Sequence, residues 1–237
     1  TTKYGIDIYG ESKLAELLEK LTKIEGIHWV RFLYAYPEGI TKELIQVVAN
    51  NDKIAKYFDI PIQHISNTVL KRMNRRTSKE QIEMLLKTIR EQIPNVVLRT
   101  SLIVGFPGET KEDFQELKTF VQTAKFDKLG TFMYSKEDGT PAEKLPNQIH
   151  GNTKKARYRQ IMEIQQEISK EIQSTKMGAT YEVLVEDMSF DGKYYIGRTM
   201  QDVPEMDGIV YIKNKTDKKP EDIVNHFVNC KVTEVRE

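Results

Sequence analysis

The chain has 237 residues, a formal net charge of +1, 39% hydrophobic residues and 30% charged residues. This composition is typical of a globular protein with a buried core, and no segment approaches the roughly 18 consecutive apolar residues of a membrane span. The single cysteine, Cys230, excludes an intramolecular disulfide framework, indicates a reducing compartment such as the cytoplasm, and cannot by itself hold zinc or an iron–sulfur cluster, so we expect no metal site.

The first 150 residues alternate predicted helices and strands. Leucines at 14, 17, 18 and 21 share one helical face. Capping signals at Thr41, at Ser78 with Gln81, and at Thr110 with Asp113 predict the starts of three more helices. Apolar runs predict four strands, at 28–37, 56–66, within 95–109 and at 128–135. The alternation predicts an α/β fold with a parallel sheet, either open or a sector of a barrel.

The remaining residues have a different composition. Residues 153–177 predict a polar helical linker with an isoleucine stripe, and short alternating runs separated by Asp191-Gly192 and Asp207-Gly208 follow. Asp-Gly between alternating runs is a strong hairpin signal. About five strands in 60 residues predict a small all-β, OB-like barrel. We therefore expect domains at 1–152 and 178–237, joined by the linker at 153–177.

The segment "SLIVGFPGET" at 101–110 contains the most distinctive loop of the chain. Its glycines, Gly105 and Gly108, supply permissive backbone to a turn between a strand and a helix. In one interpretation the segment is only a turn that connects the strand to the helix. In the other, its backbone also forms a cradle for a ligand. The spacing matches neither the phosphate-binding loop that ends in Gly-Lys-Ser/Thr nor the dinucleotide fingerprint.

Several polar residues lie on the predicted strands or at their ends. Arg99 lies within an apolar strand, so its charge must be paired or must reach a cavity, where it could hold a carboxylate. His64 is more simply interpreted as a structural residue than as a ligand. Arg75 and Arg76, in the basic run "LKRMNRR", belong to a solvated helix face or neutralise an anionic ligand. No catalytic nucleophile or base stands out.

The order of several motifs resembles the radical S-adenosylmethionine methylthiotransferases. The motifs are "YGIDIYG", "WVRFLYAYP", "FDIPIQHIS", "LKRMNRRTS", "RTSLIVGFPGET" and "FMYSKEDGTPA", followed by the small barrel. The resemblance covers essentially the whole chain. It implies a sector of a partial (β/α)₆, TIM-like radical domain followed by a barrel of the TRAM type. "LYAYP" and "DIPIQH" resemble the branch that modifies an aspartate of a small-subunit ribosomal protein.

The resemblance also implies the chemistry. In the family a [4Fe–4S] cluster on a Cys-x₃-Cys-x₂-Cys loop cleaves S-adenosylmethionine, the resulting radical abstracts hydrogen from carbon, and a second cluster takes part in the sulfur chemistry. The cluster cysteines are absent from these 237 residues. We therefore interpret the chain as the C-terminal portion of such an enzyme, without a cluster and inactive alone.

By position on the matched strands, the resemblance assigns the S-adenosylmethionine site to five residues. Ile103, Val104 and Gly105 would supply apolar and backbone contacts. Gln63 and Arg99 would supply polar groups for the ribose or the methionine carboxylate. The catalytic residues remain unknown.

The charge of the second part indicates a partner. Residues 178–237 contain 8 Lys and Arg against 12 Asp and Glu, a net charge of −4. RNA binding favours a basic surface, whereas an acidic barrel suits a basic ribosomal protein, or the ribosome through it. The alternatives are a transfer-RNA adenosine methylthiotransferase, which typically carries Ser-His-Pro and Gln-Ser-Gly at the corresponding strand ends, and a non-catalytic module that binds the ribosome or RNA.

Overall fold

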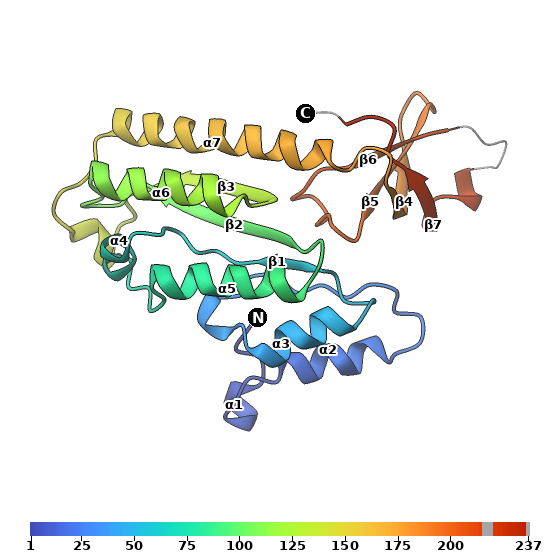
Figure 1. Ribbon diagram of the computed structural model, residues 1–237, viewed down its shortest axis with the longest axis horizontal. Helices are drawn as coiled ribbons and strands as arrows, with labels where there is room; N and C mark the ends of the chain where they lie inside the picture. The colour runs from blue at the N-terminus through green and yellow to red at the C-terminus, as the bar shows by residue number, and fades with distance from the viewer. Residues whose placement is uncertain (215–219, 236–237) are drawn as a thin grey trace. The chain divides into compact units, whose positions relative to one another are not determined.

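The structure, a computed structural model, describes residues 1–214 and 220–235, and these form two compact units that divide between Ser169 and Lys170 (Figure 1). The elements of the first unit are α1 (Ile6–Tyr9), α2 (Leu14–Thr22), η1 (Pro37–Gly39), α3 (Lys42–Asn50), β1 (Tyr57–Asp59), α4 (Asn67–Arg72), α5 (Lys79–Gln92), β2 (Val97–Val104), α6 (Lys111–Ala124), β3 (Lys128–Met133), η2 (Pro141–Lys144) and most of α7 (Gly151–Ser174). Those of the second unit are β4 (Thr180–Met188), β5 (Tyr194–Thr199), β6 (Val210–Lys213), η3 (Pro220–Asp222) and β7 (Phe227–Lys231). The predicted boundaries at 152 and 177 stay predictions.

The first unit is built on a parallel sheet of order β1-β2-β3. The parallel sheet confirms the predicted α/β class. Arg99 on β2 lies opposite Asp59 of β1 on one side and opposite Lys128 of β3 on the other. On β2 the even positions from Leu98 to Val104 are buried, and the odd positions from Arg99 are partly exposed. One face of β2 is therefore covered and the other is more open.

The predicted strand at 28–37 is wrong. Only Val30 pairs there, in one parallel bridge to Ile54. The backbone of Tyr34 is left-handed, with φ 57°, and a strand cannot continue through that conformation. The Ala35 amide still donates to the Asp59 carbonyl oxygen, so this segment follows the edge of the sheet without joining it as a strand.

The predicted strand at 56–66 is shorter than expected. It ends at Asp59, and Pro61 follows. Proline has no amide hydrogen to donate to a neighbouring strand. Gln63, with φ 70°, makes a single bridge to Leu102 beyond the proline. The described sheet therefore has three strands where four were predicted.

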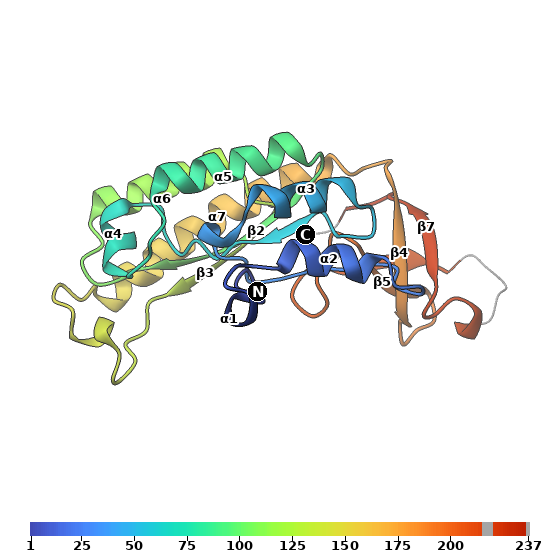
Figure 2. The same ribbon diagram turned by 90° about the horizontal axis from the view of Figure 1, so that it is seen from below.

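The predicted helix starts are confirmed by their caps. The Thr41 side chain accepts from the Leu44 amide, and capping boxes open α5 at Ser78 and α6 at Thr110. Figure 2 shows α5 and α6 on the same side of the sheet.

The predicted helical linker is α7. Its buried residues, Arg157, Ile161, Gln165 and Ile168, recur at intervals of three and four, the spacing of one helical face. Gln165 donates from Nε2 to the Phe126 carbonyl oxygen of the first unit at 2.9 Å. None of the helices in the described ranges combines the length and the hydropathy that crossing a bilayer requires.

The second unit is a curled antiparallel sheet of order β6-β5-β4-β7. Four strands are described rather than about five. Val185, Tyr195 and Ile223 form its core. The hairpin at Asp191-Gly192 is confirmed. The Ser189 amide donates to the Tyr194 carbonyl oxygen at 2.8 Å and closes the turn between β4 and β5.

The tight hairpin predicted at Asp207-Gly208 is wrong. Residues 200–209 form a longer loop between β5 and β6, in which the Asp207 carboxylate accepts from the Val203 amide at 2.8 Å. Aspartate often bonds to nearby backbone amides in this way, and a loop can use it as readily as a two-residue turn does.

Candidate functional site

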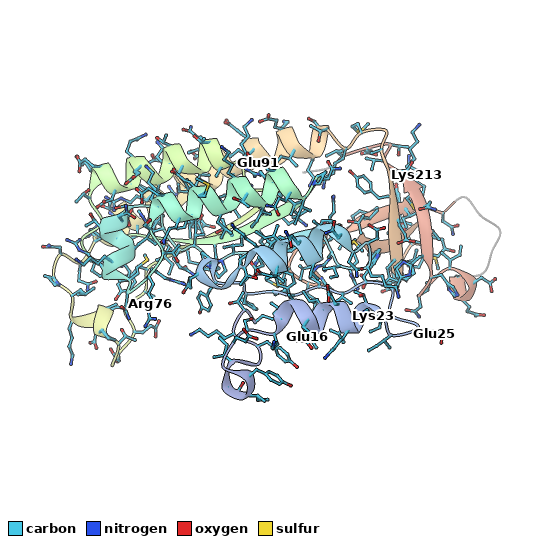
Figure 3. The ribbon with its side chains drawn as sticks, turned by 60° about the horizontal axis from the view of Figure 1, so that its bottom comes forward. Glu16, Lys23, Glu25, Arg76, Glu91 and Lys213 are labelled. Atoms are coloured by element: carbon cyan, nitrogen blue, oxygen red, sulfur yellow. The ribbon has the colours of Figure 1, made fainter. Side chains whose placement is uncertain are left out.

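Polar and glycine-rich segments follow the carboxyl ends of β1 and β2, where parallel sheets place their ligands. They comprise Gln63 and His64 beyond β1 and the loop at 105–110 beyond β2. The basic segment after α4 lies near the same end of the first unit, and Figure 3 labels Arg76 in it. This end of the sheet is the candidate site.

The amides of the loop at 105–110 are used within the protein. The Glu109 carboxylate accepts from the Gly105 and Phe106 amides, and the Asn147 carbonyl oxygen accepts from the Gly108 amide at 2.9 Å. An anion cradle needs amides that point at the anion. The loop is therefore not an anion cradle, and a ligand beside it would meet side chains, carbonyl groups and Cα atoms.

Both glycines of this loop are favoured by their backbone conformation, and Gly105 also by its packing against Lys154. Gly105 has φ +73° and Gly108 has φ +81°, values that L residues avoid. A Cβ atom on Gly105 would overlap Cγ of Lys154, and one on Gly108 would overlap Nη1 of Arg72. Arg72 also donates to the Gly108 carbonyl oxygen. The loop is thus held between side chains of α4 and α7.

Glu109 and Arg157 form a buried ion pair behind the loop. Nη1 of Arg157 lies 3.0 Å from Oε1 of Glu109, and the two side chains are 8% and 0% exposed. Arg157 also donates to the carbonyl oxygens of Glu109 and Thr110, at 3.1 and 3.3 Å. Burial raises the pKa of the Glu109 carboxyl, while the guanidinium and the two loop amides favour its charged form. These contacts attach α7 to the candidate site.

A second buried ion pair crosses the sheet from β2 to β1. Nη1 of Arg99 donates to Oδ1 of Asp59 at 2.7 Å, and the side chains are 19% and 1% exposed. Oδ2 of Asp59 accepts from the Tyr34 amide at 3.1 Å. Of the two alternatives predicted for Arg99, pairing or access to a cavity, the structure shows the pairing. Because a guanidinium has five donor hydrogens, the pairing leaves Arg99 capable of a further contact on the open face.

The predicted site residues do not all present their side chains to one place. Arg99 and Ile103 are partly exposed on the open face of β2, whereas Val104 is fully buried on the covered face. Gln63 is attached to β2 through its backbone. Its amide donates to the Ser101 carbonyl oxygen, and its own carbonyl oxygen accepts from the Ile103 amide. The Val104 carbonyl oxygen accepts from the Tyr134 amide at 2.9 Å.

His64 is a structural residue, as expected. It is fully buried, and Nδ1 accepts from the Ser66 amide at 3.0 Å. Burial lowers its pKa to about 4, so the ring is neutral near pH 7. Ser66 in turn donates to Asp113 at 2.5 Å, which ties α4 to α6 beneath the site.

The sequence interpretation missed Glu109, Arg157 and Tyr34. A glutamate directly after a glycine turn was the available signal for Glu109, because a carboxylate there can collect the amides of the turn. Arg157 carries no sequence signal, since its partner lies 48 residues away. Within the described ranges, no group of three or more His, Cys, Asp or Glu residues could hold a metal ion.

Comparison with known proteins identifies both units. Residues 5–121 match the radical SAM superfamily model and residues 177–237 match the TRAM domain model. The chain is similar to the ribosomal protein uS12 methylthiotransferase RimO of Alkaliphilus oremlandii, at 59% identity over all of this chain and 53% of that protein. It is also similar to the protein of the same name from Clostridium perfringens, at 55% identity over 92% of this chain and 49% of that protein.

The chain therefore spans about half the length of the curated relatives it matches. Among solved structures, it is similar to coproporphyrinogen III oxidase, HemN, of Escherichia coli, described as a radical SAM enzyme. That similarity has a TM-score of 0.49 at 20% identity and covers 68% of this chain and 36% of the other.

Proposed function

The chain belongs to the radical SAM superfamily and carries a TRAM domain, and from this premise we propose that the protein transfers a methylthio group to an aspartate of ribosomal protein uS12. The observation that carries the proposal is the 59% identity of the whole chain to a relative named for uS12 methylthiotransferase activity. Motifs at the candidate site, "LYAYP" and "DIPIQH", favour the same acceptor over transfer RNA.

S-adenosylmethionine would bind at the carboxyl end of the sheet. The open face of β2 offers the apolar side chain of Ile103 and the guanidinium of Arg99, a combination suited to an adenosine group and to the carboxylate of the methionine. Gln63 would complete the contacts. Val104 and Gly105, whose backbone groups are bonded to Tyr134 and Glu109, would line the base of the site. When bound, the cofactor would supply the radical that removes hydrogen from the acceptor carbon.

The iron–sulfur chemistry does not fit the residues of this chain. A [4Fe–4S] cluster is held by cysteine thiolates, and these 237 residues contain one cysteine. Cys230 lies half-buried on β7 in the second unit, outside the candidate site. In the proposal both clusters of the enzyme are held by cysteines outside these residues, and the 237 residues alone are inactive.

The acidic second unit would contact the acceptor protein. Its net charge of −4 over residues 178–237 complements a basic ribosomal protein, and such complementarity mainly raises the association rate and specificity. The reaction would take place in the cytoplasm, where the ribosome is.

The proposal is tested with the complete gene product, reconstituted anaerobically with iron and sulfide and supplied with S-adenosylmethionine and a reductant. Ribosomes and unmodified transfer RNA are offered together, and mass spectrometry locates the methylthio increment. An increment on an aspartate of uS12 is the expected result. An increment on an adenosine would replace the proposed acceptor with transfer RNA, and none on either substrate, from a preparation that carries clusters, would refute both.

A further inference from the structure

Tyr34 adopts a backbone conformation that bulky residues avoid. Its φ is +57°, in the left-handed region, where a large side chain is a genuine outlier. Such a conformation persists only where the surrounding structure enforces it, and such outliers gather at functional sites. The position of Tyr34 beside the candidate site therefore suggests a function for its side chain.

Buried groups enforce the conformation of Tyr34. Its amide donates to the Asp59 carboxylate at 3.1 Å, and the amide of the next residue, Ala35, donates to the Asp59 carbonyl oxygen at 2.8 Å. Ala35 is fully buried. Arg99 holds the Asp59 carboxylate from the other side at 2.7 Å. The ion pair of the sheet thus fixes the backbone on which the tyrosine stands.

The aromatic rings themselves are exposed. Tyr34 is 58% exposed and Tyr36 is 41% exposed, so hydrophobic burial does not account for the strained conformation. The Arg75 guanidinium lies 5.2 Å from the centre of the Tyr36 ring. Thr77 donates to Glu38 at 3.0 Å and fastens the segment of the tyrosines to the segment of Arg75.

Tyrosine and arginine are among the residue types that most often anchor a macromolecular partner, because each presents a large planar group that makes both apolar and polar contacts. Tyr34 directly precedes the residue that pairs with the end of β1, so it stands at the end of the sheet where the candidate site lies. We name Tyr34, Tyr36 and Arg75 the tyrosine rim.

We propose that the tyrosine rim binds the acceptor polypeptide beside its target carboxylate, and that Tyr34 is a specificity-determining residue for that acceptor. The Tyr34 ring packs against the peptide and Arg75 attracts the carboxylate. This inference rests on the proposed function, because it takes an aspartate-bearing polypeptide as the acceptor. Asp59 and Arg99 act as positioning residues for Tyr34.

The test uses Tyr34→Gly and Tyr34→Phe in the reconstituted full-length enzyme. Glycine accepts a positive φ without strain, so Tyr34→Gly removes the ring while the fold is kept. Tyr9→Ala is the matched control, since Tyr9 is 60% exposed on α1. The measurements are the KM for recombinant uS12, the Kd for S-adenosylmethionine by calorimetry, and the Kd for fluorophore-labelled uS12 by anisotropy.

Tyr34→Gly is expected to raise the KM and the Kd for uS12 by about tenfold, with the Kd for S-adenosylmethionine unchanged. Tyr34→Phe should restore most of the affinity, and Tyr9→Ala should behave as wild type. Unchanged KM and Kd for uS12 in Tyr34→Gly would overturn the inference.

The failure of the proposed function is a separate result. It would be seen in the wild-type enzyme, as absence of a methylthio group on uS12. In that case the anisotropy measurement still decides the inference, because equal binding of labelled uS12 by wild type and Tyr34→Gly would overturn it.

Discussion

Arg157 on α7 and Glu109 in the loop after β2 form an ion pair of 3.0 Å between side chains that are 8% and 0% exposed. The same carboxylate accepts from the amides of Gly105 and Phe106. A helix that a sequence reader would assign to a linker thus determines the shape of the loop at the candidate site. The stability of the loop and that of the helix should accordingly depend on each other.

Replacing Arg157 by methionine should strongly destabilise the protein. The change leaves the Glu109 carboxylate buried without its counter-ion, and removing one partner of a buried pair typically costs about 3–5 kcal/mol. The free energy of unfolding, measured by urea titration, should fall by that order. Arg159→Met is the matched control on the exposed side of the same helix, and a similar loss in both variants would show that the pair has no special role.

His64 should make stability depend on pH. Its pKa in the folded state, about 4, lies below the ordinary histidine value of 6.5 because burial disfavours the charged ring. The folded state therefore binds the proton less readily than the unfolded state. The stabilisation is fully present above about pH 6.5 and is lost as the pH falls towards 4, by about 3 kcal/mol in total.

The measurement compares urea unfolding of wild type and His64→Asn between pH 7 and pH 4. Asparagine keeps an acceptor near the Ser66 amide but does not titrate in this range. The difference in unfolding free energy between the two proteins should change across that window. A constant difference would contradict the assignment, and carboxylates that do not interact with His64 cancel because both proteins contain them.

Gly108→Ala should destabilise the loop for two separable reasons. The left-handed conformation, φ +81°, disfavours alanine by about 1–2 kcal/mol, and the new methyl group would overlap the Arg72 guanidinium unless that side chain moves. Because Arg72→Ala also removes the hydrogen bond to the Gly108 carbonyl oxygen, it is the reference: adding Gly108→Ala to Arg72→Ala should cost only the first part. Gly151→Ala, where a Cβ meets nothing within 4 Å, is the control, and an equal loss there would refute the argument.

Local patterns in the sequence predicted much of the fold. The capping boxes at Ser78 and Thr110 are both present, and the turn at Asp191-Gly192 forms as expected. Each depends on residues within a few positions of one another, which a sequence displays directly. The error at 28–37 came where the backbone departs from its usual conformation, at Tyr34 with φ 57°, because nothing in "YAYP" requires a left-handed residue.

The candidate site was less predictable for a related reason. The glycines of "GFPGET" suggested a cradle for a ligand, but the Glu109 carboxylate uses two of the loop amides and distant side chains fill the space beside both glycines. Arg72 and Lys154 lie 36 and 49 residues from the glycines that they contact. Contacts of this range arise from the tertiary fold, and a single sequence shows no pattern for them.

Arg99→Lys should separate two roles of Arg99. Lysine keeps the charge beside Asp59 but loses the planar fork that binds a carboxylate through two hydrogen bonds. If Arg99 contacts S-adenosylmethionine, calorimetry with the full-length enzyme should show the Kd for the cofactor raised by about tenfold. An unchanged cofactor Kd together with a raised KM for uS12 would restrict Arg99 to positioning Tyr34.

Charge reversal on the second unit should weaken binding of the acceptor protein. Glu205, Glu221 and Asp222 are exposed carboxylates. Asp202 and Asp207 accept hydrogen bonds from backbone amides, so their replacement would also disturb the loop. Changing the three exposed residues to lysine should raise the Kd for uS12 severalfold at low ionic strength, and less at 0.3 M salt, where the screening length is shorter. Reversal of Glu83, Glu91 and Glu112 on α5 and α6 is the matched control, because it changes the net charge equally in the first unit. Equal effects from both triple variants would show that only the total charge matters, and no effect from either would remove the acidic second unit from acceptor binding.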